Sequence, residues 1–184
     1  MSYPAVYRSV RQSESEFLAD YDLSLANWAD GQGTTLLMYA LRNPEPAPRA
    51  AIAGRLLDDG ADPAATSGGT NALHVLLSAT SHDFAAEPAL LARLLEGGAD
   101  INADTGDRWG TPLQTLARTF KFSDEELAPF YDVLFARPEL DVTTPSHKGR
   151  SITESAQAAG EARARLLKRC LAHAQANTAP LESR

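Results

Sequence analysis

The chain has 184 residues, of which 43% are hydrophobic and 7% aromatic, so it can form one domain or one short repeat array and need not be disordered. Its single cysteine, Cys170, excludes an internal disulfide framework. The net charge of −7 is concentrated in residues 14 to 141, which hold 21 acidic and 8 basic residues, and this argues against a nucleic-acid binder because phosphate contacts need a basic surface.

Four segments share one opening, in which a glycine and a small polar residue precede an apolar run. They are GTTLLMYAL from residue 33, GTNALHVLL from 69, GTPLQTLAR from 110 and GRSITESAQ from 149. The position before each run is held, at spacings of 36, 40 and 40 residues, by Thr35, Asn71, Thr111 and Ser151. Such side chains accept a hydrogen bond from a first-turn amide, so the pattern predicts four helix starts.

A second helix is expected after each of these, at about 49–59, 88–96, 124–136 and 160–174. Ser123, followed by acidic residues, predicts the start of the third. Two of these helices end in related phrases, LLDDGADPAA at 56–65 and LLEGGADINA at 94–103, where glycine terminates the helix. Because one such helix–loop–helix–turn unit cannot bury a core alone, we expect the units to stack.

The phrases GTPLQTLA, ALHVLL and LLEGGADINA resemble the ankyrin repeat. This resemblance implies an all-α ankyrin-repeat solenoid of about four units, forming a single domain over residues 1–184. We expect a capping helix at about 12–22, repeats at about 23–62, 63–100, 101–141 and 142–174, and a frayed tail at 175–184. The family period is about 33 residues, and the longer spacing here places extra residues between the two helices of each unit. These lengthened loops could form a second binding edge, or they could be tolerated drift.

The sequence offers few residues for catalysis. The resemblance implies a structural, hydrogen-bonded role for His74. His82 and His147 lie in predicted loops without partner spacing. Cys170 and His173 could share a helix face, but two ligands fall short of a structural zinc site, so we expect a buried thiol and a solvated histidine. The sequence therefore predicts no catalytic residue, no metal site and no cofactor.

The resemblance instead implies a partner-binding surface on the turn tips and on the exposed side of the first helices. The tip residues are Gln32, Thr34, Ser67, Asp107, Arg108, Trp109, His147 and Arg150, and the helix residues are Arg42, Asn43, Ser78 and Arg118. Trp109 beside an arginine matches the residue types of interface hot spots, although it could instead pack against a neighbouring turn or the RTFKF loop. Arg42 and Arg118 would suit a partner carboxylate.

These expectations favour a non-enzymatic protein-binding module that is a monomer on its own. A small acidic array resembles the ankyrin immunity proteins of bacteria, which bind and neutralise a cognate toxin, here one with a basic or mixed surface. A regulatory or host-directed adaptor that bridges two proteins is the alternative, and an enzyme with an unrecognised site is a third. Residues 1–12 lack a signal-peptide apolar run and no stretch approaches a membrane span, so we expect a cytoplasmic protein without a membrane partner.

Overall fold

The computed structural model describes residues 5–178, which are mostly helical. Its elements in chain order are α1 (Val6–Ser9), α2 (Glu14–Asp20), η1 (Leu23–Leu25), α3 (Leu36–Leu41), α4 (Pro46–Asp58), β1 (Thr66–Ser67), β2 (Thr70–Asn71), α5 (Ala72–Leu77), α6 (Glu87–Glu96), η2 (Gly106–Arg108), α7 (Pro112–Ala117), α8 (Ala128–Phe135), η3 (His147–Gly149), α9 (Ile152–Ala159), η4 (Gly160–Arg163) and α10 (Ala164–Thr178), where η marks a short 3₁₀ turn. Part of the expected tail, residues 179–184, lies outside the described residues.

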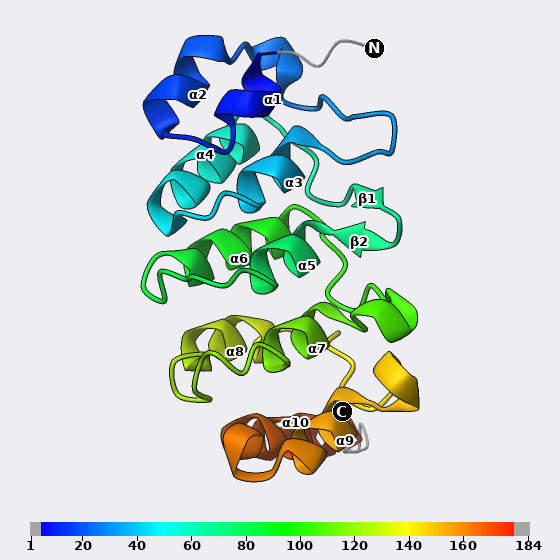
Figure 1. Ribbon diagram of the computed structural model, residues 1–184. Helices are drawn as coiled ribbons and strands as arrows, with labels where there is room; N and C mark the ends of the chain where they lie inside the picture. Colours follow the sequence, from blue (N-terminus) through cyan, green and yellow to red (C-terminus); the bar gives the residue numbers. More distant parts are fainter. Residues whose placement is uncertain (1–4, 179–184) are drawn as a thin grey trace, which may run out of the picture.

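The helices form two rows that run side by side along the molecule (Figure 1). The inner row holds α3, α5, α7 and α9, and the outer row holds α4, α6, α8 and α10. Each helix contacts the next one in its own row. An inner helix and the outer helix that follows it make one layer, and α1 and α2 lie at the N-terminal end of the stack (Figure 1).

The four predicted helix starts are confirmed, because each predicted cap accepts a hydrogen bond from the third residue of an inner helix. The donor amides lie 3.2, 3.2, 3.3 and 3.1 Å from the side-chain oxygens of Thr35, Asn71, Thr111 and Ser151. In the last three, the side chain of that third residue also bonds back to the cap amide, which completes a capping box. The recurring polar residue therefore sets where each inner helix begins.

Some helix boundaries differ from the expected ones. Ser123 caps a turn rather than a helix, since its Oγ accepts the Glu126 amide at 3.2 Å while α8 begins only at Ala128. The last outer helix begins at Ala164, after a 3₁₀ turn. The short strands β1 and β2, which pair antiparallel, were not predicted; Gly68 and Gly69 between them have φ of 56° and 77°, the left-handed pair that a two-residue hairpin turn requires.

The core lies between the two rows. Inner helices contribute fully buried leucines such as Leu41 and Leu76, and outer helices contribute residues such as Leu91 and Phe130. Cys170 on α10 joins this core, which confirms the expected buried thiol. Because a short helix pair has little core of its own, burial between layers stabilises the whole stack.

We expect Cys170 to be unreactive toward Ellman's reagent in the folded protein and to react fully in denaturant. Its side chain is buried, and burial raises the pKa of the thiol to about 11, so the nucleophilic thiolate is scarce at neutral pH. Absorbance of the released thionitrobenzoate measures the reaction. Fast labelling without denaturant would show that α10 opens readily.

Polar side chains tie each layer to the next. His74, buried in α5, places Nε2 3.0 Å from the Gly110 carbonyl, and Gln114, at the same position of α7, donates to the Arg150 carbonyl at 2.8 Å. The structural role expected for His74 is thus confirmed. Gly110 has φ of 73°, and a Cβ there would lie 2.0 Å from the Gln114 Oε1, so only glycine fits at this contact.

Stability should fall as the pH is lowered from about 7 to about 5. Burial lowers the pKa of His74, so the folded protein keeps this imidazole neutral while the unfolded chain takes up a proton as the pH drops through the ordinary histidine range. The stabilisation is present above that range and lost toward the lower folded-state pKa. Urea denaturation across this window measures the slope, and His74→Gln should flatten it. An unchanged slope in the variant would contradict this role.

The lengthened inter-helix loops are held by two buried arginines. Arg49, from α4, donates to the Asn43 carbonyl at 2.7 Å and the Ser81 carbonyl at 2.5 Å, and it pairs with the buried Glu87 carboxylate at 2.6 Å. Arg163, before α10, donates to the carbonyl of Ala117 at the end of α7 at 2.7 Å, and to the carbonyls of Thr119 and Phe122 in the loop between α7 and α8. The loops are therefore ordered parts of the fold rather than loose insertions.

Candidate protein-binding surface

Five of the predicted binding residues gather on the exposed side of the inner row. We call Arg42, Arg108, Trp109, Arg118 and Arg150 the arginine–tryptophan surface. The guanidinium carbon of Arg118 lies 5.7 Å from the centroid of the Trp109 ring, and its Nη1 donates to the Arg108 carbonyl at 3.4 Å. The Trp109 side chain stays 39% exposed. Trp109 thus packs against Arg118, the first residue of the RTFKF loop, as the alternative expectation for this residue held in part. The rest of its ring remains exposed.

One hollow of about 190 Å³ lies between α5 and α7 and is lined by Arg42, Thr70, His74, Val75, Ser78, Arg108, Trp109 and Thr115. The Arg42 guanidinium stacks over Tyr39, 5.4 Å from the ring centroid, which fixes its direction. The lining combines two arginines with an aromatic ring and small polar groups, and it includes no acidic residue. Such a lining can hold a negatively charged or aromatic side chain.

A second hollow, of about 270 Å³, is lined in part by Arg118, whose guanidinium lies over the Trp109 ring of the first. We call it the α7–α9 hollow; it is lined by Gln114, Ala117, Arg118, Phe120, His147, Lys148, Arg150, Ser155, Ala156, Ala159 and Arg163. No acidic residue lines this hollow either. Phe120, which is 64% exposed, supplies an apolar wall.

The charges of the two rows are organised differently. Outer-row arginines form ion pairs, for instance Arg93 with Asp58 at 2.6 Å and Arg169 with Asp132 at 2.6 Å. Within residues 5–178, none of the arginines of the arginine–tryptophan surface forms such a pair. An acidic protein therefore presents a locally positive face on its inner row, a difference that overall charge does not reveal.

Three predicted binding residues are buried instead, so the exposure expected of them was wrong. Thr34 is buried and its Oγ1 lies 3.0 Å from the Ser67 Oγ of the next turn. Asn43 is 1% exposed and donates to the Gln12 carbonyl at 2.8 Å, which fastens the N-terminal helices to the first layer. His147 is 9% exposed, and its Cβ packs against Gly110. Buried and exposed side chains alternate along the turn tips, and this alternation has no sequence pattern. A buried tip residue therefore cannot be told from its exposed neighbour by sequence alone.

The remaining predicted residues are accessible but are partly engaged in the fold. Gln32 is exposed, and its carbonyl accepts the hydroxyl of the half-buried Ser67 at 3.0 Å. Ser78 is exposed on α5 and bonds back to the Val75 carbonyl. The Asp107 carboxylate accepts the Lys148 amide at 2.8 Å and so joins two turn tips. These residues form the margin of the arginine–tryptophan surface.

Two histidines have partners that sequence spacing did not reveal. The His82 side chain is fully buried among aromatic rings, and its Nδ1 lies 2.5 Å from the second oxygen of Glu87. It therefore belongs to the buried Arg49 cluster rather than to a free loop. His173, expected to be solvated, is half-buried and places Nε2 2.9 Å from the Leu140 carbonyl. The sequence gives no local pattern that would reveal this cluster, because 38 residues separate Arg49 from Glu87.

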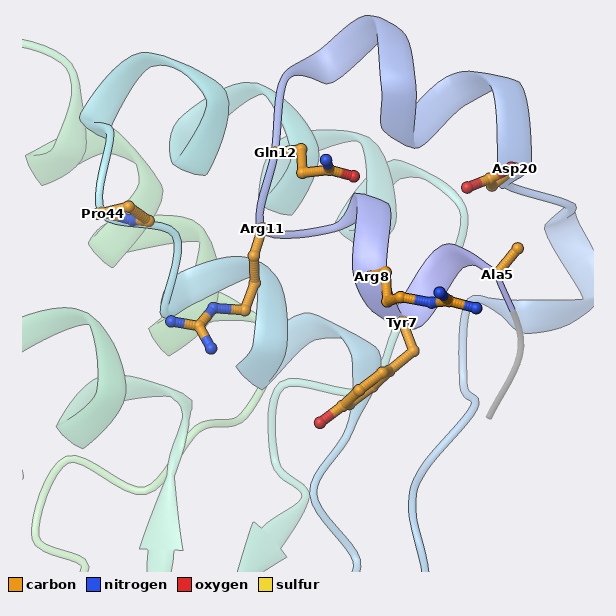
Figure 2. Close-up of a pocket in the computed structure, with 7 residues that line it drawn as sticks. All are labelled: Ala5, Tyr7, Arg8, Arg11, Gln12, Asp20 and Pro44. Atoms are coloured by element: carbon orange, nitrogen blue, oxygen red, sulfur yellow. The ribbon is translucent and has the colours of Figure 1, made fainter. Parts of the chain in front are cut away.

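A wider hollow of about 670 Å³ lies at the N-terminal end, lined by Ala5, Tyr7, Arg8, Arg11, Gln12, Asp20 and Pro44. In Figure 2, Arg11 extends on the side of Pro44 and Arg8 on the side of Asp20. The two arginines thus face different surroundings, one of them near a carboxylate. Because charges of both signs line this shallow space, it lacks the uniform positive character of the other two hollows.

Among residues 5–178, no group of three or more His, Cys, Asp or Glu side chains is placed to hold a metal ion. None of the described helices has both the length and the apolar character that crossing a membrane requires.

Comparisons with known proteins give a fold but no family. No protein-family model and no curated protein matches the chain. A crystal structure of a functionally unknown protein from Leptotrichia buccalis is similar, with a TM-score of 0.75 and 20% identity over 97% of each chain. The two chains thus share an architecture along their whole length, and at this identity the likeness shows the fold alone.

Proposed function

We propose that this chain is an ankyrin-repeat protein that binds another protein through its arginine–tryptophan surface and catalyses no reaction itself. The stacked helix pairs with recurring polar caps support the repeat assignment. The observation that carries the binding role is the exposed Trp109 ring, which lies at a turn tip and is stacked against Arg118 at the end of α7. Tryptophan and arginine dominate binding hot spots, and a preorganised surface lowers the entropic cost of association.

Within that class, the proposed role is that of an immunity protein, which binds and neutralises a cognate bacterial toxin in the cytoplasm and is a monomer before it meets its partner. The support is analogy of size and fold, together with the overall charge of −7, which speeds encounter with a basic or mixed toxin surface. Association with such a partner should slow as salt is raised.

The second candidate is an adaptor that bridges two proteins. Phe120, in the loop between α7 and α8, is the most exposed large apolar side chain among the described residues. Most of this loop lies on the edge of the molecule away from the turn tips (Figure 1), and its residues 121–126 line a depression outside the α7–α9 hollow, where a second partner could bind.

A tagged pull-down from the native cell, with neighbouring genes co-expressed, tests these proposals. An immunity protein should capture a single partner at one-to-one stoichiometry that resists high-salt washing and is toxic when expressed alone. An adaptor should capture two partners, only one of which is lost with Trp109→Ala. Failure of the intact, folded protein to capture any protein would contradict both roles.

A further inference from the structure

The α7–α9 hollow carries an excess of positive charge that the protein itself does not balance. Arg118, Lys148, Arg150 and Arg163 line it, and none of the four forms an ion pair with any residue from 5 to 178. Three of these side chains are exposed at the rim, and Arg163 lies below them at 2% exposure. The hollow therefore concentrates cations in one small volume.

Arg163 differs in this respect from the other buried arginine of the chain. Arg49 is 1% exposed and is matched by the Glu87 carboxylate. Arg163 is equally buried, yet its described partners are backbone carbonyls, including those of Thr119 and Phe122, and the Phe120 ring, whose centroid lies 4.9 Å from the guanidinium carbon. A buried guanidinium is normally balanced by an anion, because removing a charge from water is costly. Arg163 therefore has no carboxylate in direct contact on the side of the α7–α9 hollow, although acidic residues line the depression on its other side.

His147 gives a second, independent indication of a ligand. Its ring is nine-tenths buried in the lining of the hollow, and in the described part of the chain its Nδ1 has no hydrogen-bond partner. Burial lowers the pKa of this imidazole, and the charges of Arg118 and Lys148 act in the same direction. A neutral ring can donate from Nδ1 to an oxygen acceptor, whereas an unpaired buried nitrogen is destabilising.

We propose that the α7–α9 hollow binds a glutamate or aspartate side chain on an acidic segment of the partner protein. Arg118 and Arg150 pair with the carboxylate, His147 donates to it, and Phe120 packs against the methylene groups of its stem. This inference rests on the proposed protein-binding function and names the chemistry of the contact. It also refines the expectation of a basic or mixed partner surface, because the local charge of the hollow is opposite to that of the whole chain.

An acidic peptide fits these observations better than a nucleic acid does. The hollow of about 270 Å³ has room for a side chain, and beyond Phe120 the surface turns acidic, with Asp124, Glu125, Glu126 and Glu161 lining the neighbouring depression. The phosphates of a longer nucleic-acid strand would extend into this acidic depression and be repelled there, whereas a short acidic peptide can end before it.

The probe for the test is an acetylated, amidated and fluorescein-labelled hexaglutamate peptide, with hexaglutamine as its neutral counterpart. Fluorescence anisotropy at low salt should show binding of hexaglutamate alone. Arg118→Gln and Arg150→Gln should each weaken it by about tenfold or more, since a charged hydrogen-bonded pair is lost. Arg165→Gln is the matched control, because Arg165 is an exposed cation on the outer row that pairs with Glu125 at 3.3 Å. Thermal denaturation checks that each variant is folded.

A site-specific readout comes from nitrogen-15 NMR of the histidine rings. The ring resonances of His147 should move on titration with hexaglutamate, while those of His74, which is tied to Gly110, should not. Equal binding of hexaglutamine, or no effect of the Arg118 and Arg150 variants, would overturn the proposal. So would tighter, equally arginine-dependent binding of oligo(dT), which would indicate a nucleic-acid surface.

Failure of this inference can be told apart from failure of the protein-binding function. If a captured partner still binds Arg118→Gln and Arg150→Gln with unchanged affinity, the binding module stands and the carboxylate site does not. If no protein is captured but hexaglutamate binds with the expected arginine dependence, the anion-binding chemistry stands and the protein-binding function does not.

Discussion

Replacement of Arg49 by methionine is expected to lower the free energy of unfolding by about 3–5 kcal/mol. The loss is large because the substitution leaves buried groups without partners. The fully buried Glu87 carboxylate would lose its cation, and the carbonyls of Asn43 and Ser81 would lose their hydrogen-bond donors. Urea denaturation followed by circular dichroism measures the loss. Because such a change approaches the whole stability of many domains, the variant should be partly unfolded under mild conditions.

Two controls separate this effect from simple loss of an arginine. Arg93→Met removes an exposed cation paired with Asp58 at 2.6 Å and should cost at most about 1 kcal/mol. Adding Glu87→Gln to Arg49→Met should recover part of the stability, since the amide is neutral and still accepts from His82. Equal losses for Arg49→Met and Arg93→Met would show that the buried cluster has no special role.

The second large effect is expected on binding. Trp109→Ala should weaken the complex with the captured partner by about 2–4 kcal/mol, or roughly 30- to 1000-fold in Kd. The ring is 39% exposed, so its removal opens no internal cavity, but it takes away the aromatic face that Arg118 orients. Isothermal titration calorimetry with the purified partner measures the change, and thermal denaturation should show little difference from the parent protein.

Leu171→Ala is the matched control for this prediction. Leu171 is an apolar residue of α10 that is 49% exposed, and it belongs to the outer row. Its truncation removes a comparable exposed apolar group without touching the arginine–tryptophan surface. Loss of affinity in Leu171→Ala, with none in Trp109→Ala, would place the interface on the opposite side of the molecule.

Local signals in the sequence predicted much of the helical framework. A polar cap followed by an apolar run acts within a few residues, so Thr35 and Ser151 could be placed without knowing the fold. The sequence at the end of an inner helix does not indicate which residues are exposed. Arg42 and Asn43 are consecutive, yet one is exposed and the other donates to a carbonyl 31 residues earlier in the chain. Contacts between distant segments decide such cases, and they leave no local pattern.

The same reason explains what was missed in the candidate site. Arg163 was not singled out because its carbonyl partners lie 41 to 46 residues away and any residue type can supply a carbonyl. His147 sits in a turn whose register depends on Lys148, a non-glycine residue with φ of 54°. The residues that follow it, Lys148 to Arg150, are exposed, so sequence position alone indicates that His147 is exposed as well. The positive character of the inner row depends on which arginines form ion pairs with carboxylates, and most of these pairs join residues far apart in the sequence.

The ties between layers have a mechanical consequence. His74 connects its layer to the next at Gly110, and Gln114 repeats the connection one layer later at Arg150. Each of these hydrogen bonds joins one layer to the next, so tension applied to the two ends of the chain acts on a series of similar contacts between layers. Such a molecule should lengthen in discrete increments under force, each about one layer of chain, and should shorten by the same increments when the force is released.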